Sequence, residues 1–436
     1  MLKRPVNSYT EYMRRSLAPL TTSRVIPYCG ITFLLALAAH NKASDVALIA
    51  YVLAIFSVLS VVTSMSLGAT GNLIAEYSAD TPGRRRLFQG GFGVALVMAL
   101  VALLVGSVLV SVVIYLPGAQ MATSKIHTLA LIYTAAIPLL VINTFLHFFH
   151  EASGDAAACS AIKSSSTALA CICLCIAYGT SDSDNFIYWA MGYFIFSEAV
   201  LLVCLLGLSW RRQLCFSPVY CERTVQNIIK LGLPIAFGVA GQKLYFYLLT
   251  EKLATLTSVL VAQLSVYMSV MGLLMIPVVA YCQAHSLYIS GHAEQRRVSY
   301  AKGQAGLGAG VVLMLCMLLW VGPLLFFWLG GSIVTFDRDA FVSMAFLLAS
   351  SAILSLSTAH LRGLRDALAP QLMMNVLMLS VLVPIIYFAG LGSADIHFYL
   401  RLQSGGLLMG FIALQLRIRH MHAKAGVTAA TVCLDK

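Results

Sequence analysis

Apolar runs of helical length follow one another along the chain, and this pattern limits its fold more than any other feature. A bilayer core about 30 Å thick needs roughly 20 apolar residues per helix. The 436 residues are 60% hydrophobic and only 10% charged, with a mean hydropathy of +0.87, which leaves too little polar surface for a soluble domain. We therefore predict an all-α polytopic membrane protein.

A scan for such runs gives twelve predicted transmembrane helices. They cover residues 20–41, 46–70, 89–116, 125–147, 156–178, 186–208, 226–250, 255–283, 304–329, 341–361, 367–391 and 396–416.

Basic residues lie mainly in alternate connecting segments. Twenty of the 28 Lys and Arg residues fall on one side of the predicted membrane, and only Lys42, Lys125, Lys252 and Arg338 fall on the other. Basic residues accumulate in cytoplasmic loops, so we expect both termini to be cytoplasmic, in a bacterial-type inner (plasma) membrane. The net charge of +11 follows from this topology and requires no nucleic-acid partner. The twenty residues are Lys3, Arg4, Arg14, Arg15, Arg84, Arg85, Arg86, Arg211, Arg212, Arg223, Lys230, Arg296, Arg297, Lys302, Arg362, Arg365, Arg417, Arg419, Lys424 and Lys436.

The cysteines do not indicate a metal centre or a disulfide framework. The eleven residues follow neither zinc nor disulfide spacing. Cys171, Cys173 and Cys175 lie in an apolar run, where small residues of a membrane core are expected. We therefore expect no metal and no organic cofactor.

Two distant parts of the sequence repeat at an offset of 211 residues. GNLIAEYSADTPGRRR (71–86) matches CQAHSLYISGHAEQRR (282–297). The same offset aligns SGDAAA with LRDALA and places Asp155 on Asp366. Because two separate segments agree on one offset, we infer an internal duplication.

The duplication predicts a two-lobed architecture. Residues 1–210 would form an N-terminal six-helix lobe, 211–225 a cytoplasmic linker, and 226–436 a C-terminal six-helix lobe with a short cytoplasmic tail. Six helices per copy is an even number, so both copies enter the membrane in the same direction. Their pseudo-twofold axis would lie along the membrane normal, as in some secondary transporters.

Three segments resemble a known transporter family. KLGLPIAF (230–237) and VAQLSVYMSVMGLLMIPVVAYCQAHSLYISGHAEQRR (261–297) resemble the second half of multidrug and toxic compound extrusion (MATE) transporters, and SMSLGATGNLIAEYSADTPGRRR (64–86) resembles the matching first-half segment. The resemblance implies the MATE-like V of two six-helix bundles in the MOP flippase superfamily. It also implies alternating-access export of small organic molecules from a central cavity by H⁺ or Na⁺ antiport.

Five polar residues inside predicted spans are candidates for lining the substrate cavity. Lys243 lies 17 residues into the span 226–250. An intramembrane charge usually faces protein or water. Tyr245 and Tyr247 follow it in the same segment, and Gln263 matches a position that is often polar in the family. The candidates are Gln242, Lys243, Tyr245, Gln263 and Arg401.

Glu198 is the candidate for coupling to an ion, because it is the one carboxylate well inside a predicted span. A buried carboxyl group whose surroundings tune its proton affinity can load and release a proton. A glutamate that only joins two helices by hydrogen bonds is the alternative. Arg24 and Lys163 lie near cytoplasmic span ends, and we interpret them as side chains that extend back to the interface.

The sequence departs from the family at the acids tied to ion coupling. No Asp or Glu occurs between Glu11 and Asp45, where the first span would carry one, or between Glu222 and Glu251 in the seventh. A cavity with Gln242 and Lys243 in place of an acid should attract anions. We therefore expect an anionic or zwitterionic substrate.

Two other functions remain open at this stage. A flippase for lipid-linked oligosaccharide or polysaccharide precursors would also use intramembrane basic residues. A membrane enzyme would need clustered catalytic groups, for which HFFHEASGD (147–155) is the one candidate, and we interpret it as a solvated helix end. We expect no enzymatic activity and a monomer whose partners are the lipid bilayer and a small organic substrate.

Overall fold

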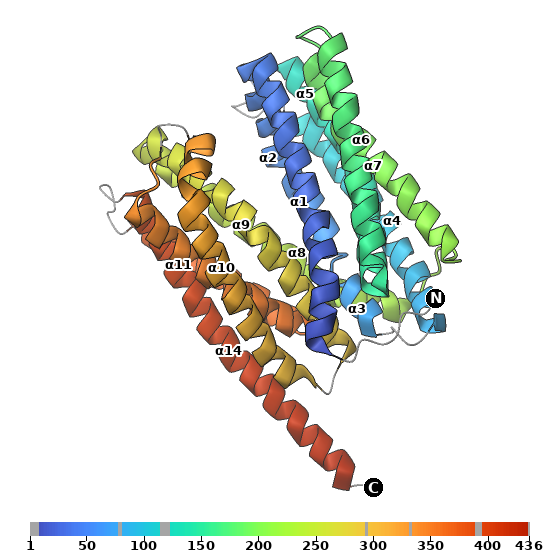
Figure 1. Ribbon diagram of the computed structural model, residues 1–436. Coiled ribbons are helices and arrows are strands. Elements are labelled where there is room, and N and C mark those ends of the chain that lie inside the picture. The colour runs from blue at the N-terminus through green and yellow to red at the C-terminus, as the bar shows by residue number, and fades with distance from the viewer. Residues whose placement is uncertain are drawn as a thin grey trace. The chain divides into compact units, whose positions relative to one another are not determined.

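The computed structural model describes residues 8–76, 81–113, 123–292, 295–330, 334–388 and 395–434. Every regular element within these ranges is a helix (Figure 1). Lys3, Arg4 and Lys436, which the charge pattern assigns to the cytoplasmic face, lie outside the described residues.

Long helices overlap all twelve predicted spans. Within the described residues, two short segments interrupt the α-helices: η4 is π-helical, and η2 is a kink that contains the non-helical Gly154. The elements are α1 (Tyr9–Asn41), α2 (Ala43–Met65), α3 (Thr70–Glu76), α4 (Thr81–Val113), α5 (Thr123–His150), η2 (Glu151–Asp155), α6 (Ala156–Thr180), α7 (Phe186–Arg211), α8 (Glu222–Leu256), α9 (Ser258–Gly291), α10 (Arg296–Gly330), α11 (Arg338–Gly363), α12 (Leu368–Asn375), η4 (Val376–Leu382), α13 (Val383–Phe388) and α14 (Ile396–Leu434).

Within the described residues, nine stretches are long and apolar enough to cross a membrane. One of them, Ser124–Thr180, contains both α5 and α6. The helices α8 and α14 are not among the nine, and each includes a polar end, ERTVQNIIK in α8 and RIRHMHAK in α14. The chain is thus an all-helical integral membrane protein, and the twelve-span arrangement stays a prediction.

Internal contacts divide the chain into two units. One is Ala18–Val239, called the N-terminal unit below, and the other joins Met1–Leu17 to Ala240–Lys436 and is called the C-terminal unit. The division falls inside α1 and α8, so the first residues of α1 pack with the second half of the sequence.

In the N-terminal unit, α5 packs against α4, α7 and α2, while α6 packs against α7. Phenylalanines fill the space between α4 and α5. The Phe88 ring lies 4.9 Å from the Phe149 ring and 5.8 Å from the Phe145 ring, and all three side chains are buried. Edge-to-face packing of this kind adds to the stabilisation from buried area.

In the C-terminal unit, α11 packs against α14, α9 and α10. Side-chain caps fix the first turns of two of these helices. Thr257 accepts a hydrogen bond from the Leu260 N–H at the start of α9, and Asp337 accepts one from the Ala340 N–H at the start of α11. Each cap satisfies a backbone donor that has no partner within its helix.

Hydroxyl groups inside the apolar helices bond to their own backbone. The Thr63 and Ser64 hydroxyls of α2 donate to carbonyl oxygens four residues earlier, at 2.8 Å and 2.6 Å. Lipid offers no hydrogen-bond partner, so polar groups in a membrane helix must be satisfied within the protein.

The aspartates that the 211-residue offset aligns occupy matching places in their units. Asp155 directly precedes α6 and pairs with Arg212, which follows α7. Asp366 closely precedes α12 and pairs with Arg417 of α14, with 2.8 Å between Nε and Oδ2. Each unit therefore ties the start of its fifth predicted span to its sixth, as the inferred duplication predicts.

Candidate functional site

The N-terminal unit contains a buried network of acidic and basic side chains, centred on Glu151. This residue begins η2, the kinked segment between α5 and α6. Its side chain is 1% exposed, and its Oε1 lies 2.9 Å from Nε2 of His147, one turn earlier on α5. A buried carboxylate requires partners of this kind, because burial without them is costly.

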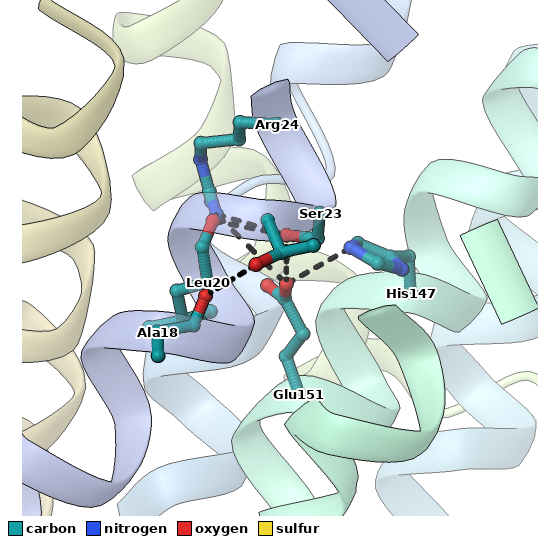
Figure 2. A network of polar contacts seen from close by, with 7 residues as sticks. Ala18, Leu20, Ser23, Arg24, His147 and Glu151 are labelled. Carbon is teal, nitrogen blue, oxygen red and sulfur yellow. Dashed lines mark hydrogen bonds and ion pairs between the residues drawn. The ribbon is translucent and has the colours of Figure 1, made fainter. Parts of the chain in front are cut away.

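Two residues of α1 reach the same carboxylate. The Ser23 hydroxyl lies 3.3 Å from Oε1 of Glu151, and Nη1 of Arg24 lies 4.0 Å from it. The Arg24 guanidinium also donates to the Leu20 carbonyl at 2.5 Å. In Figure 2, dashed lines join Ser23 and Arg24 of α1 to the Glu151 carboxylate, which His147 also contacts.

A second carboxylate lies on α7. The Asn143 amide group, on α5, donates to Oε2 of Glu198 and to the Glu198 backbone carbonyl, both at 2.7 Å. Asn143 and His147 are four residues apart on α5, so they share one helix face. This face of α5 therefore contacts both carboxylates.

Lys163 of α6 interacts electrostatically with Glu198 and, more weakly, with Glu151. Its side chain is partly buried. The network therefore contains two carboxylates, from η2 and α7, and two basic groups, from α1 and α6, while α5 contributes Asn143 and His147. The attraction between these acidic and basic side chains offsets part of the free energy that each loses when it is removed from water.

The groups around the two carboxylates are mainly hydrogen-bond donors and differ from the oxygen ligands that a metal ion requires. Na⁺ needs several oxygen ligands, whereas Glu198 faces an amide N–H and Glu151 faces imidazole and guanidinium nitrogen. Among the described residues, no group of three or more His, Cys, Asp or Glu side chains is arranged to hold a metal ion. The arrangement can accept, hold and release protons.

The burial of this network corrects one interpretation made from the sequence and extends another. HFFHEASGD is not a solvated helix end, because His147, His150 and Glu151 are 7%, 0% and 4% exposed. Arg24 turns back along α1, and its guanidinium lies beside Glu151 within the unit, so its charge is paired with a carboxylate instead of freely solvated. In both cases the partner comes from a helix that is distant in sequence, which a local pattern cannot reveal.

The predicted cavity residues lie in different surroundings within the C-terminal unit. Lys243 is exposed, whereas Gln242 and Gln263 are partly buried. Tyr245 is 1% exposed and packs in the apolar core. These placements do not test a role in substrate binding, which stays a prediction for all of them.

Arg401, the fifth of these residues, has an ion-pair partner. Its Nη2 lies 2.6 Å from Oδ1 of Asp339 on α11, and both side chains are largely exposed. Nε of Arg401 also donates to the Ser343 hydroxyl at 3.3 Å. The positive charge of Arg401 is thus largely offset by a neighbouring carboxylate.

No family model matches the sequence, and no curated protein matches it. Solved structures match it closely in fold. A MOP superfamily transporter from Pyrococcus furiosus has a TM-score of 0.80 at 11% identity over 95% of this chain and 97% of that one. An outward-facing multidrug resistance MATE family transporter has a TM-score of 0.75 at 12% identity over 95% and 97%. A MATE transporter in complex with MaD5 has a TM-score of 0.76 at 12% identity over 97% and 100%.

Identities this low establish the fold alone. The chain has the fold of MATE and other MOP superfamily transporters over nearly its whole length, which confirms the resemblance of its sequence segments at the level of structure.

Proposed function

We propose that the chain is a secondary active exporter of small organic molecules that works by alternating access and exchanges substrate for H⁺. The observation that carries this proposal is the network of the buried Glu151 with the partly buried Arg24, Lys163 and Glu198, in a chain with a transporter fold. Buried charges are costly, and in membrane proteins they commonly mark ion or substrate pathways.

The proposed coupling step is the protonation of Glu198. A proton on its carboxylate removes the negative charge that interacts most strongly with Lys163 and leaves that ammonium group less compensated. With Glu198 ionised, its attraction to Lys163 stabilises one arrangement of α6 and α7. Protonation of Glu198 removes that stabilisation. A proton gradient can in this way shift the population between two conformations of the N-terminal unit.

The wider architecture belongs to the same proposal. We place twelve spans in two six-helix bundles related by a pseudo-twofold axis along the membrane normal, with the linker at 211–225 and both termini in the cytoplasm. The protein would act as a monomer in the inner membrane, without a cofactor. The matching Asp155–Arg212 and Asp366–Arg417 pairs support the duplication on which this arrangement rests.

We further propose an anionic or zwitterionic substrate. Lys243 is exposed and makes no ion pair among the described residues, so its charge is available to a ligand. The Pyrococcus furiosus transporter offers a precedent, since the reverse polarity of its binding pocket suggests a different function for that protein. A flippase for lipid-linked oligosaccharide precursors is the second candidate, because the same exposed lysine suits an anionic pyrophosphate carrier.

The test is transport by purified protein in proteoliposomes under imposed pH or Na⁺ gradients, with fluorescent anionic and cationic dyes as probes. We expect a pH gradient to drive anionic-dye transport, and Glu198→Gln to reduce it by about 100-fold or more. Asp182→Asn, at an exposed residue outside the network, should transport as the wild type does. Transport that depends on a Na⁺ gradient, or that survives in Glu198→Gln, contradicts the coupling.

The flippase alternative has its own measurement. Vesicles containing a fluorescent pyrophosphate-linked lipid are treated with dithionite, which quenches only the outer leaflet. Rapid loss of the protected signal, without any effect of a pH gradient, would favour the flippase over the exporter.

A further inference from the structure

Three histidines form a continuous hydrogen-bonded row through the C-terminal unit. Nε2 of His285, on α9, lies 3.1 Å from Nδ1 of His360 on α11. Nε2 of His360 lies 3.0 Å from Nε2 of His422 on α14. His285 and His360 are 0% exposed, whereas His422 is partly exposed. The row therefore connects the surface of α14 to the interior of the unit.

Two tyrosines extend the row at its buried end. The Tyr9 hydroxyl, at the start of α1, lies 2.9 Å from Nδ1 of His285 and 3.4 Å from the Tyr281 hydroxyl. Tyr281 in turn donates to the Gly303 carbonyl at 3.1 Å. Four helices that are distant in sequence thus contribute one uninterrupted line of hydrogen-bonding groups.

With all side chains neutral, the hydrogen bonds of this row can run from donor to acceptor in either of two opposite directions. In the first, Tyr9 donates to His285, His285 to His360, and His360 to His422. In the second, His422 donates to His360, His360 to His285, and His285 to Tyr9, which then donates to Tyr281. A neutral imidazole has one donor and one acceptor nitrogen, so each direction makes the Tyr9–His285 bond and both bonds between the histidines. The Tyr9–Tyr281 bond is made in the second direction, because Tyr281 donates to Gly303.

Moving one proton along the row converts the first direction into the second. Tyr9 passes its proton to Nδ1 of His285, and its oxygen takes a proton from a hydronium ion at the tyrosine pair, which leaves a neutral water molecule. Each Nε2 proton of His285 and His360 moves to the next ring. His422 then loses its Nδ1 proton to water. One proton enters, one leaves, and every ring is neutral at the end.

The charged and titratable groups around the row disfavour a histidine that keeps an extra proton. They are compatible with a proton that only passes along the row. On α10, Arg296 interacts with His360 and His422, Arg297 interacts with His422, and the Tyr300 ring lies 4.3 Å from His360. On α9, Tyr281, Cys282 and Tyr288 interact with Tyr9. Among the described residues, no carboxylate is one of these neighbours. A resident imidazolium would therefore be buried without a counter-charge, which is costly.

We propose that Tyr9, His285, His360 and His422 form a proton relay between the α14 surface and Tyr281. Its outer end lies beyond the predicted span 396–416, beside residues that the charge pattern assigns to the cytoplasmic face. This relay goes beyond the exporter proposed above, because it is a second proton-handling element and shares no residue with the network around Glu151.

The relay differs from a structural row of histidines in one measurable property. A relay needs both hydrogen-bond directions to be populated, so each buried ring must exchange between its two neutral tautomers. A purely structural row needs one direction only, and each ring then keeps one tautomer.

The test is ¹⁵N NMR of histidine-labelled full-length protein in lipid nanodiscs at neutral pH. We expect averaged signals for the two ring nitrogens of His285 and His360, with neither nitrogen fully protonated. His422→Ala removes the outer end, so tautomer exchange in both rings should be lost. Imidazole-4-acetate, added as a small mobile replacement for the missing ring, should restore it.

Two further variants serve as controls. His360→Phe fills a similar volume and should fix His285 as one tautomer, with no recovery on addition of imidazole-4-acetate. His397→Gln changes a partly buried histidine of α14 that hydrogen-bonds to Ser343 and lies outside the row, so the averaged signals should persist.

Single fixed tautomers in the wild type would overturn the relay. Averaged signals that persist in His422→Ala without any additive would also overturn it, as would a loss that imidazole-4-acetate does not reverse. The measurement needs no transported substrate, so its outcome is independent of the Glu198→Gln transport assay, and either proposal can fail while the other stands.

Discussion

Gly154 and Arg365, which lie 211 residues apart, both have a left-handed backbone, with φ of 92° and 66°. The offset between them equals the one that aligns the repeated sequence segments. Each directly precedes an aspartate that forms an ion pair with an arginine near the end of its unit, Asp155 in one case and Asp366 in the other. The backbone conformation at these two positions is thus consistent with the inferred duplication, although a glycine occupies one position and an arginine the other.

Replacing Gly154 with alanine should destabilise the protein through the backbone alone. A Cβ built at Gly154 meets nothing within 4 Å, so no steric clash is expected. A left-handed conformation costs a residue with a Cβ about 1 kcal/mol or more, and we expect Gly154→Ala to lower the free energy of unfolding by about that amount. Chemical denaturation of purified protein in detergent measures the change.

The matched control is Gly192→Ala. Gly192 lies within α7, and its added Cβ also meets nothing within 4 Å. Alanine is favoured over glycine inside a helix by roughly 0.5–1 kcal/mol, so this variant should be slightly more stable than the wild type. A shift of the same sign in both variants would refute the backbone explanation.

Glu151→Gln should destabilise the N-terminal unit strongly. The substitution keeps the shape of the side chain but removes one of the two negative charges that balance Arg24 and Lys163. Removing one partner of a buried ion pair typically costs about 3 kcal/mol or more, and Arg24, at 20% exposed, is only slightly screened by solvent. The readout is the midpoint of denaturant unfolding.

Glu11→Gln provides the comparison for this measurement. Glu11 pairs with Arg15 on the exposed side of α1, where the two side chains are 42% and 54% exposed. Exposed pairs contribute less than about 1 kcal/mol. If Glu11→Gln and Glu151→Gln had equal effects, the buried network would not be the stabilising element inferred here.

The exposed lysine and the paired arginine should differ in their effect on substrate binding. Lys243 makes no ion pair among the described residues, whereas Arg401 is paired with Asp339. Loss of one charge-assisted hydrogen bond to an anion costs about 1.5 kcal/mol or more, so Lys243→Gln should weaken binding of an anionic substrate by about tenfold. Arg401→Gln should weaken it by less than about threefold, because Asp339 already offsets the charge.

Isothermal titration with the best anionic substrate from the proteoliposome assay would measure both affinities. A cationic dye serves as the control ligand, and its affinity should stay the same or increase in Lys243→Gln. Equal losses in Lys243→Gln and Arg401→Gln would remove the argument for an anion site at Lys243.

Helix positions were largely predictable from the sequence, whereas the networks were not. Apolar runs of fixed length determine where a membrane helix forms, so long helices overlap every predicted span. Glu198 was conspicuous in the sequence, because it is a carboxylate in the middle of an apolar run, and its coupling role stays a prediction. Asn143, its hydrogen-bond partner, was missed because it lies on another helix, 55 residues away.

The histidine row shows the same limit more clearly. His285, His360 and His422 are separated by 75 and 62 residues, and no local pattern in the sequence connects them. The one available signal was that all three lie near predicted cytoplasmic ends of C-terminal helices. Depth in the membrane can be estimated from the sequence, but the face that each helix presents to its neighbours depends on packing.

The protein should lose stability as the pH falls below about 6.5, in part through His422. Burial and the nearby Arg297 and Arg296 lower the pKa of His422 from its ordinary value of 6.5. In the unfolded chain the imidazole keeps the ordinary pKa, so below that pH the unfolded state binds a proton that the folded state does not. The contribution to stability is therefore complete above about pH 6.5 and is lost as the pH falls toward the lowered value.

In this window, the slope of the unfolding free energy against pH measures how many more protons the unfolded state binds than the folded state. His422→Gln should reduce that difference by up to one proton. Arg297→Gln retains the histidine but removes a repelling charge, so the pKa of His422 should move back toward 6.5 and the slope should decrease by a smaller amount. Denaturant unfolding between about pH 5 and pH 8 measures both slopes. A wild-type slope in His422→Gln would mean that other groups account for the acid sensitivity. A slope that steepens in Arg297→Gln would contradict the stated effect of the arginine.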